Sequence, residues 1–68
     1  MIFENIVLLC ENKGISVAEL ERKVGLGNAT IRTWEKSDPG AKKLKRVADF
    51  FGVSVDSILS DRVDPPRM

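Results

Sequence analysis

The stretch 17–36 constrains the fold of this chain most, because it consists of two short amphipathic segments that flank a pair of glycines. Leu20 and Val24 form the apolar edge of the first segment, and Ile31 and Trp34 form that of the second. Apolar residues three or four positions apart lie on one side of a helix, so this spacing predicts two short helices whose apolar edges pack together. The second helix then carries its polar side chains at the surface, namely Asn28, Thr30, Arg32, Thr33 and Lys36.

Apolar periodicity predicts three further helices and hence an all-α fold. The clearest pattern lies in the segment 41–51, where Leu44, Val47, Ala48 and Phe51 share one face. A chain of 68 residues buries only roughly 60% of the surface that its unfolded form exposes, which is enough for one small domain. The expected helices are 2–12, 16–24, 28–37, 41–51 and 54–59.

Local signals mark the beginnings and ends of the two central helices. Ser16 and Glu19 have the Ser-x-x-Glu spacing of a capping box, in which each side chain accepts a hydrogen bond from the other residue's backbone amide. Gly25 is expected to end the first helix, since glycine adopts a positive φ at low cost. The next helix should begin after Gly27 or Asn28, with the amides of its first turn exposed.

The end of the chain predicts a short helix followed by a tail. Ser54 is expected to cap this helix, and Ile58 and Leu59 to face the core. The composition then changes to Asp-Arg-Val-Asp-Pro-Pro-Arg-Met. We therefore expect one domain at 1–60 and a flexible tail at 61–68.

The composition excludes several kinds of functional site. One cysteine and no histidine cannot form an intramolecular disulfide, a Cys/His zinc cluster or a histidine general base. No apolar run approaches the roughly 20 residues that span a bilayer. We expect a cytoplasmic protein that is not an enzyme and uses no metal, cofactor or small-molecule substrate. Cys10 is expected to be a small buried hydrophobe, and the carboxylates Glu11, Glu19, Glu21 and Glu35 to cap helices or face solvent.

The net charge of +1 conceals an uneven distribution along the chain. Residues 1–21 contain four acids and one base, a net charge of −3. Residues 22–46 contain eight bases and two acids, a net charge of +6, and residues 47–68 contain two bases and four acids, a net charge of −2. A positive field in the middle of the chain suits a polyanionic partner, although a solvated basic face would look the same.

Five segments of the chain, taken in order, resemble a known family. They are Leu20 in the second helix, the turn at Gly25, Ile31 with Trp34, the helix with Leu44, Val47, Ala48 and Phe51, and the run Gly52-Val53-Ser54-Val55-Asp56-Ser57-Ile58-Leu59. Together they resemble the Cro and phage-repressor (XRE-type) helix-turn-helix domain, and more narrowly the small regulators of Gram-positive phages and mobile elements. The resemblance implies a compact five-helix bundle of the lambda-repressor-like DNA-binding type, with helices 2 and 3 forming the helix-turn-helix.

Three positions depart from the pattern of the family. Val17 stands where the family usually has a glutamine that touches a phosphate, and Glu21 where an alanine is common. Cys10 stands where many members have an arginine, so Glu35 lacks its customary partner. These departures affect the transfer of individual contacts rather than that of the fold.

The resemblance implies a transcriptional regulator, a repressor, that binds double-stranded DNA sequence-specifically with helix 3 in the major groove. The implied base-contacting residues are Asn28, Ala29, Thr30, Arg32 and Thr33, and the implied phosphate-contacting residues are Ser16, Val17, Lys36, Ser37, Gly40, Lys42 and Lys43. Asparagine suits adenine, arginine suits guanine, and a methyl group suits the thymine methyl. Alternatively, Asn28 and Thr30 only satisfy the start of the helix and the lysines only keep the protein soluble. Trp34 is expected to pack in the core rather than to stack on a base.

A second hypothesis is a protein-interaction module on the same fold, such as an antirepressor or an adaptor. It rests on the first helix, where Val7 and Leu8 exceed what one buried face needs. A half-buried boundary position for Val7 is an equally simple explanation. The exposed part of this helix, or the last helix with the tail, would also be available for a homodimer contact, which would help a small DNA-binding domain to bind specifically.

Overall fold

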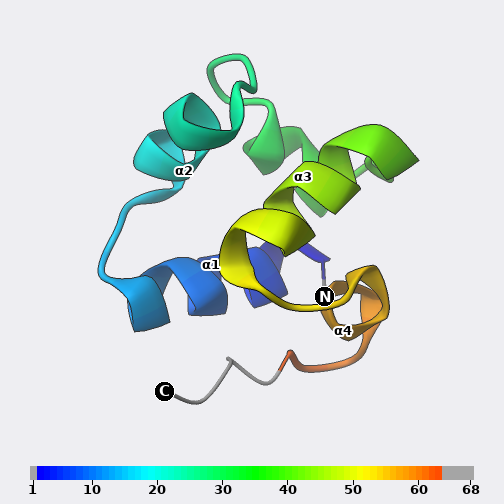
Figure 1. Cartoon of the computed structure of the whole chain (residues 1–68). Coiled ribbons are helices and arrows are strands. Elements are labelled where there is room, and N and C mark those ends of the chain that lie inside the picture. The colour runs from blue at the N-terminus through cyan, green and yellow to red at the C-terminus, as the bar shows by residue number, and fades with distance from the viewer. Residues whose placement is uncertain (1, 64–68) are drawn as a thin grey trace.

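The computed structural model describes residues 2–63 of the chain. This part contains four α-helices, one 3-10 helix and no strand (Figure 1). The elements are α1 (Ile2–Lys13), α2 (Val17–Val24), the 3-10 helix η1 (Ile31–Glu35), α3 (Ala41–Phe51) and α4 (Val55–Leu59). The all-α class is therefore confirmed, whereas the third of the five expected helices is shorter than expected and is not an α-helix.

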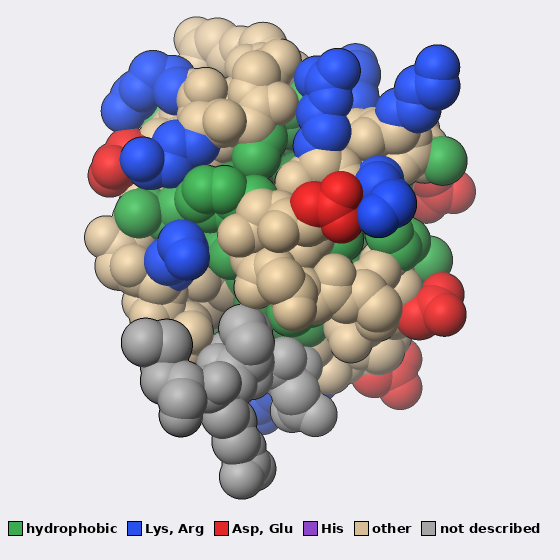
Figure 2. Space-filling model, in the orientation of Figure 1, with side chains coloured by type: hydrophobic (Ala, Val, Ile, Leu, Met, Phe, Trp, Pro, Cys, Tyr) green, Lys and Arg blue, Asp and Glu red, His purple; other side chains and the backbone are tan. Residues whose placement is uncertain are grey.

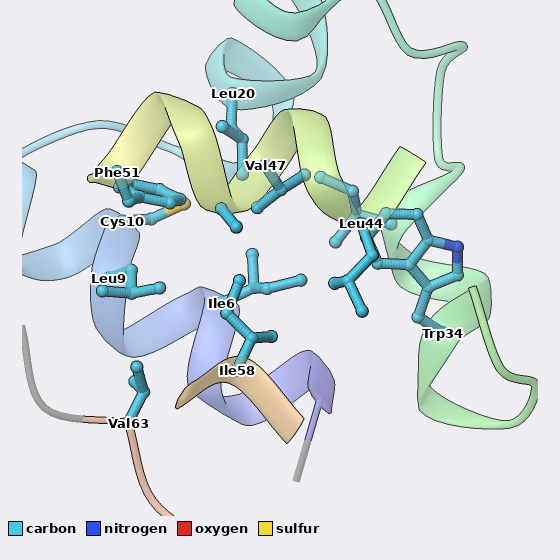
Figure 3. Packing of buried hydrophobic residues seen from close by; sticks show 12 residues of the cluster. Ile6, Leu9, Cys10, Leu20, Trp34, Leu44, Val47, Phe51, Ile58 and Val63 are labelled. Atoms are coloured by element: carbon cyan, nitrogen blue, oxygen red, sulfur yellow. The ribbon is translucent and has the colours of Figure 1, made fainter. Parts of the chain in front are cut away.

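Helix α1 is the element on which most of the others rest. It packs against α2, η1 and α4, while α3 packs against α2 and α4 (Figure 1). Side chains from all five elements fill the space between them, as Figure 3 shows for most of the cluster. The buried hydrophobic residues are Ile6, Leu9, Cys10, Leu20, Ile31, Trp34, Leu44, Val47, Ala48, Phe51, Ile58 and Val63.

The local start and stop signals act as expected at α2. The Ser16 hydroxyl oxygen accepts a hydrogen bond from the Glu19 amide at 3.1 Å, and the Ser16 amide donates to Glu19 Oε1 at 3.4 Å. Gly25 ends the helix with φ +75°, the left-handed conformation that glycine adopts without a Cβ clash. The Ser54 hydroxyl likewise caps α4 by accepting from the Ser57 amide at 3.1 Å. The predicted boundaries of these helices are thus confirmed.

Two expectations about apolar side chains are settled by the packing. Trp34 is only 7% exposed, which confirms its place in the core. Leu59, in contrast, is 51% exposed, so the expectation that it faces inward was wrong. Helix α4 has only five residues and one buried position, which Ile58 occupies. On α1, Leu8 packs partly against the core and Val7 is half-buried, so little of the apparent apolar surplus reaches the surface.

The side chain of Asn5 ties the two ends of the described chain together. It lies on α1, is only 1% exposed, and its Nδ2 donates to the carbonyls of Ile58 and Ser60 at 2.8 Å each. Its Oδ1 accepts from the amide of Val63 at 3.0 Å. Val63 is itself buried in the core, although it belongs to the expected tail 61–68. The remainder of that tail, 64–68, lies outside the described residues.

We predict that Asn5→Ala lowers the free energy of unfolding by about 2 to 4 kcal/mol, because it leaves two carbonyls and one amide without their partner. The matched control is Asn12→Ala, which removes an exposed asparagine from the same helix. Urea unfolding followed by circular dichroism measures both variants. Equal stability of the two would show that the Asn5 contacts contribute little.

Cys10 is buried against the core and is 2% exposed. Burial, with a smaller contribution from the charge of Glu11, raises the pKa of its thiol from an ordinary 9.0 to about 11. The unfolded chain therefore loses this proton at lower pH than the folded chain does. The raised pKa of the Cys10 thiol therefore stabilises the folded state fully below pH 9, and this contribution disappears as the pH rises toward 11.

We predict that the wild-type protein loses stability between pH 9 and pH 11 more steeply than the Cys10→Ala variant does. The difference in slope should approach about 1.4 kcal/mol per pH unit, the value for one proton. The comparison uses the difference between the two slopes, because the contributions of groups other than Cys10 cancel in it. Urea unfolding at several pH values measures it, and parallel slopes would contradict a buried thiol.

Candidate nucleic-acid interface

The turn between α2 and η1 places three polar or small residues at the surface. The Leu26 amide donates to the Glu21 carbonyl at 2.8 Å, and the chain then turns at 28–30. Ala29 has a φ of +62°, which is uncommon for a residue with a Cβ. Asn28 and Ala29 are exposed and Thr30 is half-buried. This turn occupies the place where we expected the first turn of the third helix.

The side chain of Glu21 explains why η1 starts late. The residue is 4% exposed, and its two carboxylate oxygens accept backbone hydrogen bonds from one residue of the turn and from the first residue of η1. Oε1 accepts from the Ala29 amide at 3.2 Å, and Oε2 accepts from the Ile31 amide at 2.8 Å. The amides that we expected to be exposed are therefore taken by a side chain that we expected to cap a helix or face solvent. Glu21 lies four positions after Val17 and three before Val24, both of which pack against the core, and this spacing is the sequence signal that indicates an inward side chain.

Burial of Ile31 and Trp34 turns the side chains between them outward. These two residues lie three positions apart, which places them on the same side of a 3-10 helix. Arg32 and Thr33 are accordingly exposed. The Thr33 hydroxyl donates to the Thr30 carbonyl at 2.6 Å, which fixes its rotamer while its oxygen can still accept. All five residues expected to contact bases thus lie within one short stretch of turn and 3-10 helix.

The chain that follows η1 is held by a single acceptor. The Thr33 carbonyl accepts from the Lys36 amide at 3.1 Å, and from the amide and hydroxyl of Ser37 at 3.0 Å each. Gly40 is the N-cap residue of α3. The side chains of Lys42 and Lys43 are exposed on the first turn of α3 and form no ion pair with any described residue. This region therefore presents free cations next to a fixed loop.

The two expected phosphate contacts at the start of α2 are less available. The Ser16 amide and hydroxyl are both used in the capping box with Glu19, and a phosphate would have to compete for them. Val17 is half-buried and packs against the core. The candidate phosphate contacts consequently fall into two groups, one at the start of α2 and one between Lys36 and Lys43.

Lysine and arginine side chains gather over the part of the molecule that contains α2 and α3 (Figure 2). Arg22 and Lys23 are exposed at the end of α2, and Arg46 is exposed on α3. The Arg46 Nη1 atom lies 3.9 Å from the position that a Cβ would occupy at Gly25, so its guanidinium is beside the turn. These three residues are not among the predicted site residues, although they belong to the segment 22–46 with its net charge of +6.

The observed geometry agrees with a comparison with protein families. Residues 6–58, most of the chain, match a family model described as helix-turn-helix, of the Cro/C1 type. The chain belongs to this helix-turn-helix family. No curated protein and no solved structure shows significant similarity to the chain.

α2 and η1 are consecutive helices that lie within residues 6–58, the part of the chain that matches the family model. Membership of the family indicates sequence-specific DNA binding by a regulator, and such domains are typically not enzymes. None of the described helices is long and apolar enough to cross a membrane. Within residues 2–63, no group of three or more His, Cys, Asp or Glu side chains could hold a metal ion.

We predict that Ala29→Val destabilises the domain by about 1 to 3 kcal/mol, because a β-branched side chain is strained at positive φ. Ala29→Gly should leave the stability within about 1 kcal/mol of wild type, because glycine adopts this conformation freely but loses more chain entropy on folding. Ala41→Val, at an exposed helical position, is the matched control and should change it by less than about 0.5 kcal/mol. Thermal unfolding measures all three, and equal effects of the two valines would contradict a left-handed Ala29.

Proposed function

We propose that the protein is a sequence-specific double-stranded DNA-binding transcriptional regulator that represses by occupying an operator. The observation that carries the proposal is the stretch 28–33, in which Asn28, Ala29, Arg32 and Thr33 are exposed. Glu21 fixes its backbone from one side, and the buried Ile31 anchors it in the core. A rigid element with outward polar side chains is what reading base edges requires. In this proposal the turn and η1 enter the major groove.

The proposed base contacts follow from the donors and acceptors of the exposed side chains. Asn28 would pair with adenine through its amide, and Arg32 with guanine through two parallel hydrogen bonds. Ala29 and the methyl groups of Thr30 and Thr33 would contact thymine methyls. Each good bidentate pair contributes about 1 to 3 kcal/mol of discrimination against the wrong base.

Phosphates would be contacted mainly between η1 and the first turn of α3. Lys36, Lys42 and Lys43 supply charge there, and Ser37 and Gly40 lie in the fixed loop between them. Ser16 and Val17 would add contacts at the start of α2, after the capping box opens. Such contacts set the register of the protein on DNA and carry no sequence information themselves.

The proposal includes a homodimer and a cytoplasmic location. One domain of this size reaches a single half-site, and two copies can read half-sites about 34 to 36 Å apart on one face of the duplex. The more specific assignment to regulators of Gram-positive phages and mobile elements belongs to the same proposal. The adaptor hypothesis is less well supported, because Leu8 packs against the core and Val7 is half-buried.

We predict that Arg32→Ala weakens binding to the selected operator about 10- to 100-fold and relaxes the preference at one base pair. Lys43→Ala should instead weaken specific and random duplexes alike and lower the salt slope by about one. Lys45→Ala and Arg62→Ala are the controls; Lys45 pairs with Asp49 at 2.9 Å, and Arg62 lies outside the site. Both controls should bind nearly as wild type does.

Fluorescence anisotropy measures these affinities on an operator selected from a random library, and sedimentation of the complex gives its stoichiometry. We expect two chains per duplex with two half-sites. Equal losses on specific and random DNA for both Arg32→Ala and Lys43→Ala would contradict base reading. Absence of any binding or salt dependence with random duplex at low salt would favour the adaptor.

A further inference from the structure

The carboxylate of Glu21 is the one described acidic side chain that lies in the interior of the protein. Ionised carboxylates are rarely this buried unless hydrogen bonds replace the lost water. Here the replacement comes from two backbone amides, those of Ala29 and Ile31, at 3.2 and 2.8 Å. Ile31 is the first residue of η1, so its amide has no partner in the preceding turn, and Ala29 lies in the turn two residues before it.

These two hydrogen bonds fix the backbone on both sides of Thr30 and so restrict rotation of the turn. The Thr30 amide between them donates to the Gly27 carbonyl at 3.2 Å, so three successive amides are held. Between the two held ends, Ala29 stays at φ +62°, a conformation that an alanine adopts only under constraint. Rotation of Ala29 to the right-handed region would redirect the side chains on either side of it, Asn28 and Thr30.

We propose that Glu21 is a positioning residue for sequence discrimination, which holds the turn 28–30 in the geometry that reads bases without itself contacting DNA. This inference rests on the proposed function. Its consequence is specific: loss of the Glu21 hydrogen bonds should lower the affinity for the operator more than the affinity for random duplex, because random duplex is bound through phosphates.

The charge of Glu21 also predicts that the affinity for random duplex does not fall when this side chain is replaced. A carboxylate next to a DNA-binding surface opposes the phosphates, so its neutralisation should leave random binding unchanged or strengthen it. Glu21 also lines a surface hollow together with Ala18, Arg22, Leu26 and Asn28, which places it near a proposed base-reading residue. The carboxylate of Glu21 therefore weakens the electrostatic attraction between the protein and DNA, but it orders the backbone of the turn 28–30.

The test compares Glu21→Gln with Glu35→Gln, a matched loss of one charge at an exposed position of η1. Glutamine keeps the length of the side chain but has one acceptor oxygen, so one of the two amides loses its bond; Glu21→Ala removes both. We expect the ratio of operator to random affinity to fall about tenfold in Glu21→Gln and further in Glu21→Ala. In Glu35→Gln this ratio should stay near that of wild type.

Amide hydrogen exchange, followed by NMR, tests the two hydrogen bonds to Glu21 in the absence of DNA. The amides of Ala29 and Ile31 should be protected in wild type and in Glu35→Gln, and at least one should exchange faster in Glu21→Gln. Unprotected amides in wild type would overturn the inference. So would an unchanged affinity ratio, or parallel losses on both duplexes, in a folded Glu21→Gln variant.

The two proposals fail in different ways. If wild type prefers no duplex over another, the proposed function fails, and with it the role of Glu21 in discrimination, while amide exchange still reports whether Glu21 holds the turn. If wild type discriminates and Glu21→Gln discriminates equally well, the proposed function stands and the positioning role is wrong.

Discussion

Backbone hydrogen bonding at the ends of short helices is the constraint on which this structure depends. Every helix leaves amides unpaired at its start and carbonyls unpaired at its end, and five short elements have many such ends for their length. Serines and left-handed glycines satisfy the ends that lie at the surface. Two interior positions need a different solution, and buried side chains supply it: Asn5 for the end of α4 and the chain beyond it, and Glu21 for the turn before η1.

These two buried polar residues differ in the sequence separation of the residues that they join. Asn5 joins positions more than 50 residues apart, so it closes the fold by fixing the segment after α4 on α1. Glu21 joins positions eight and ten residues apart, so it shapes one local turn. Loss of a buried partner costs more than the net gain of making the bond, because the remaining groups lose water without replacement. In the part of the chain that the structure describes, the fold and the candidate site thus each contain one buried polar side chain in an otherwise apolar interior.

The sequence predicts the features whose causes are local. The Ser16 and Glu19 pair, the glycine at 25 and the apolar spacing of α3 act within a few residues, and the structure has each of them as expected. The features that the sequence did not predict depend on contacts between elements. The end of η1 is fixed locally, but its late start requires knowing that Glu21 turns inward, and the exposure of Leu59 requires knowing that Ile58 fills the only core position of α4.

For the candidate site, the sequence predicted which residues reach the surface better than it predicted their backbone. Ile31 and Trp34 lie three positions apart, and this spacing sends Arg32 and Thr33 outward in an α-helix and in a 3-10 helix alike. The exposure of Arg32 and Thr33 therefore does not depend on the kind of helix, whereas the directions of Asn28, Ala29 and Thr30 do. Because α1 supports η1 through the core, a core variant would disturb stability and the site together. The side chain of Glu21 instead bonds only to the backbone of Ala29 and Ile31, so the proposed discrimination between DNA sequences would change there while the fold remains.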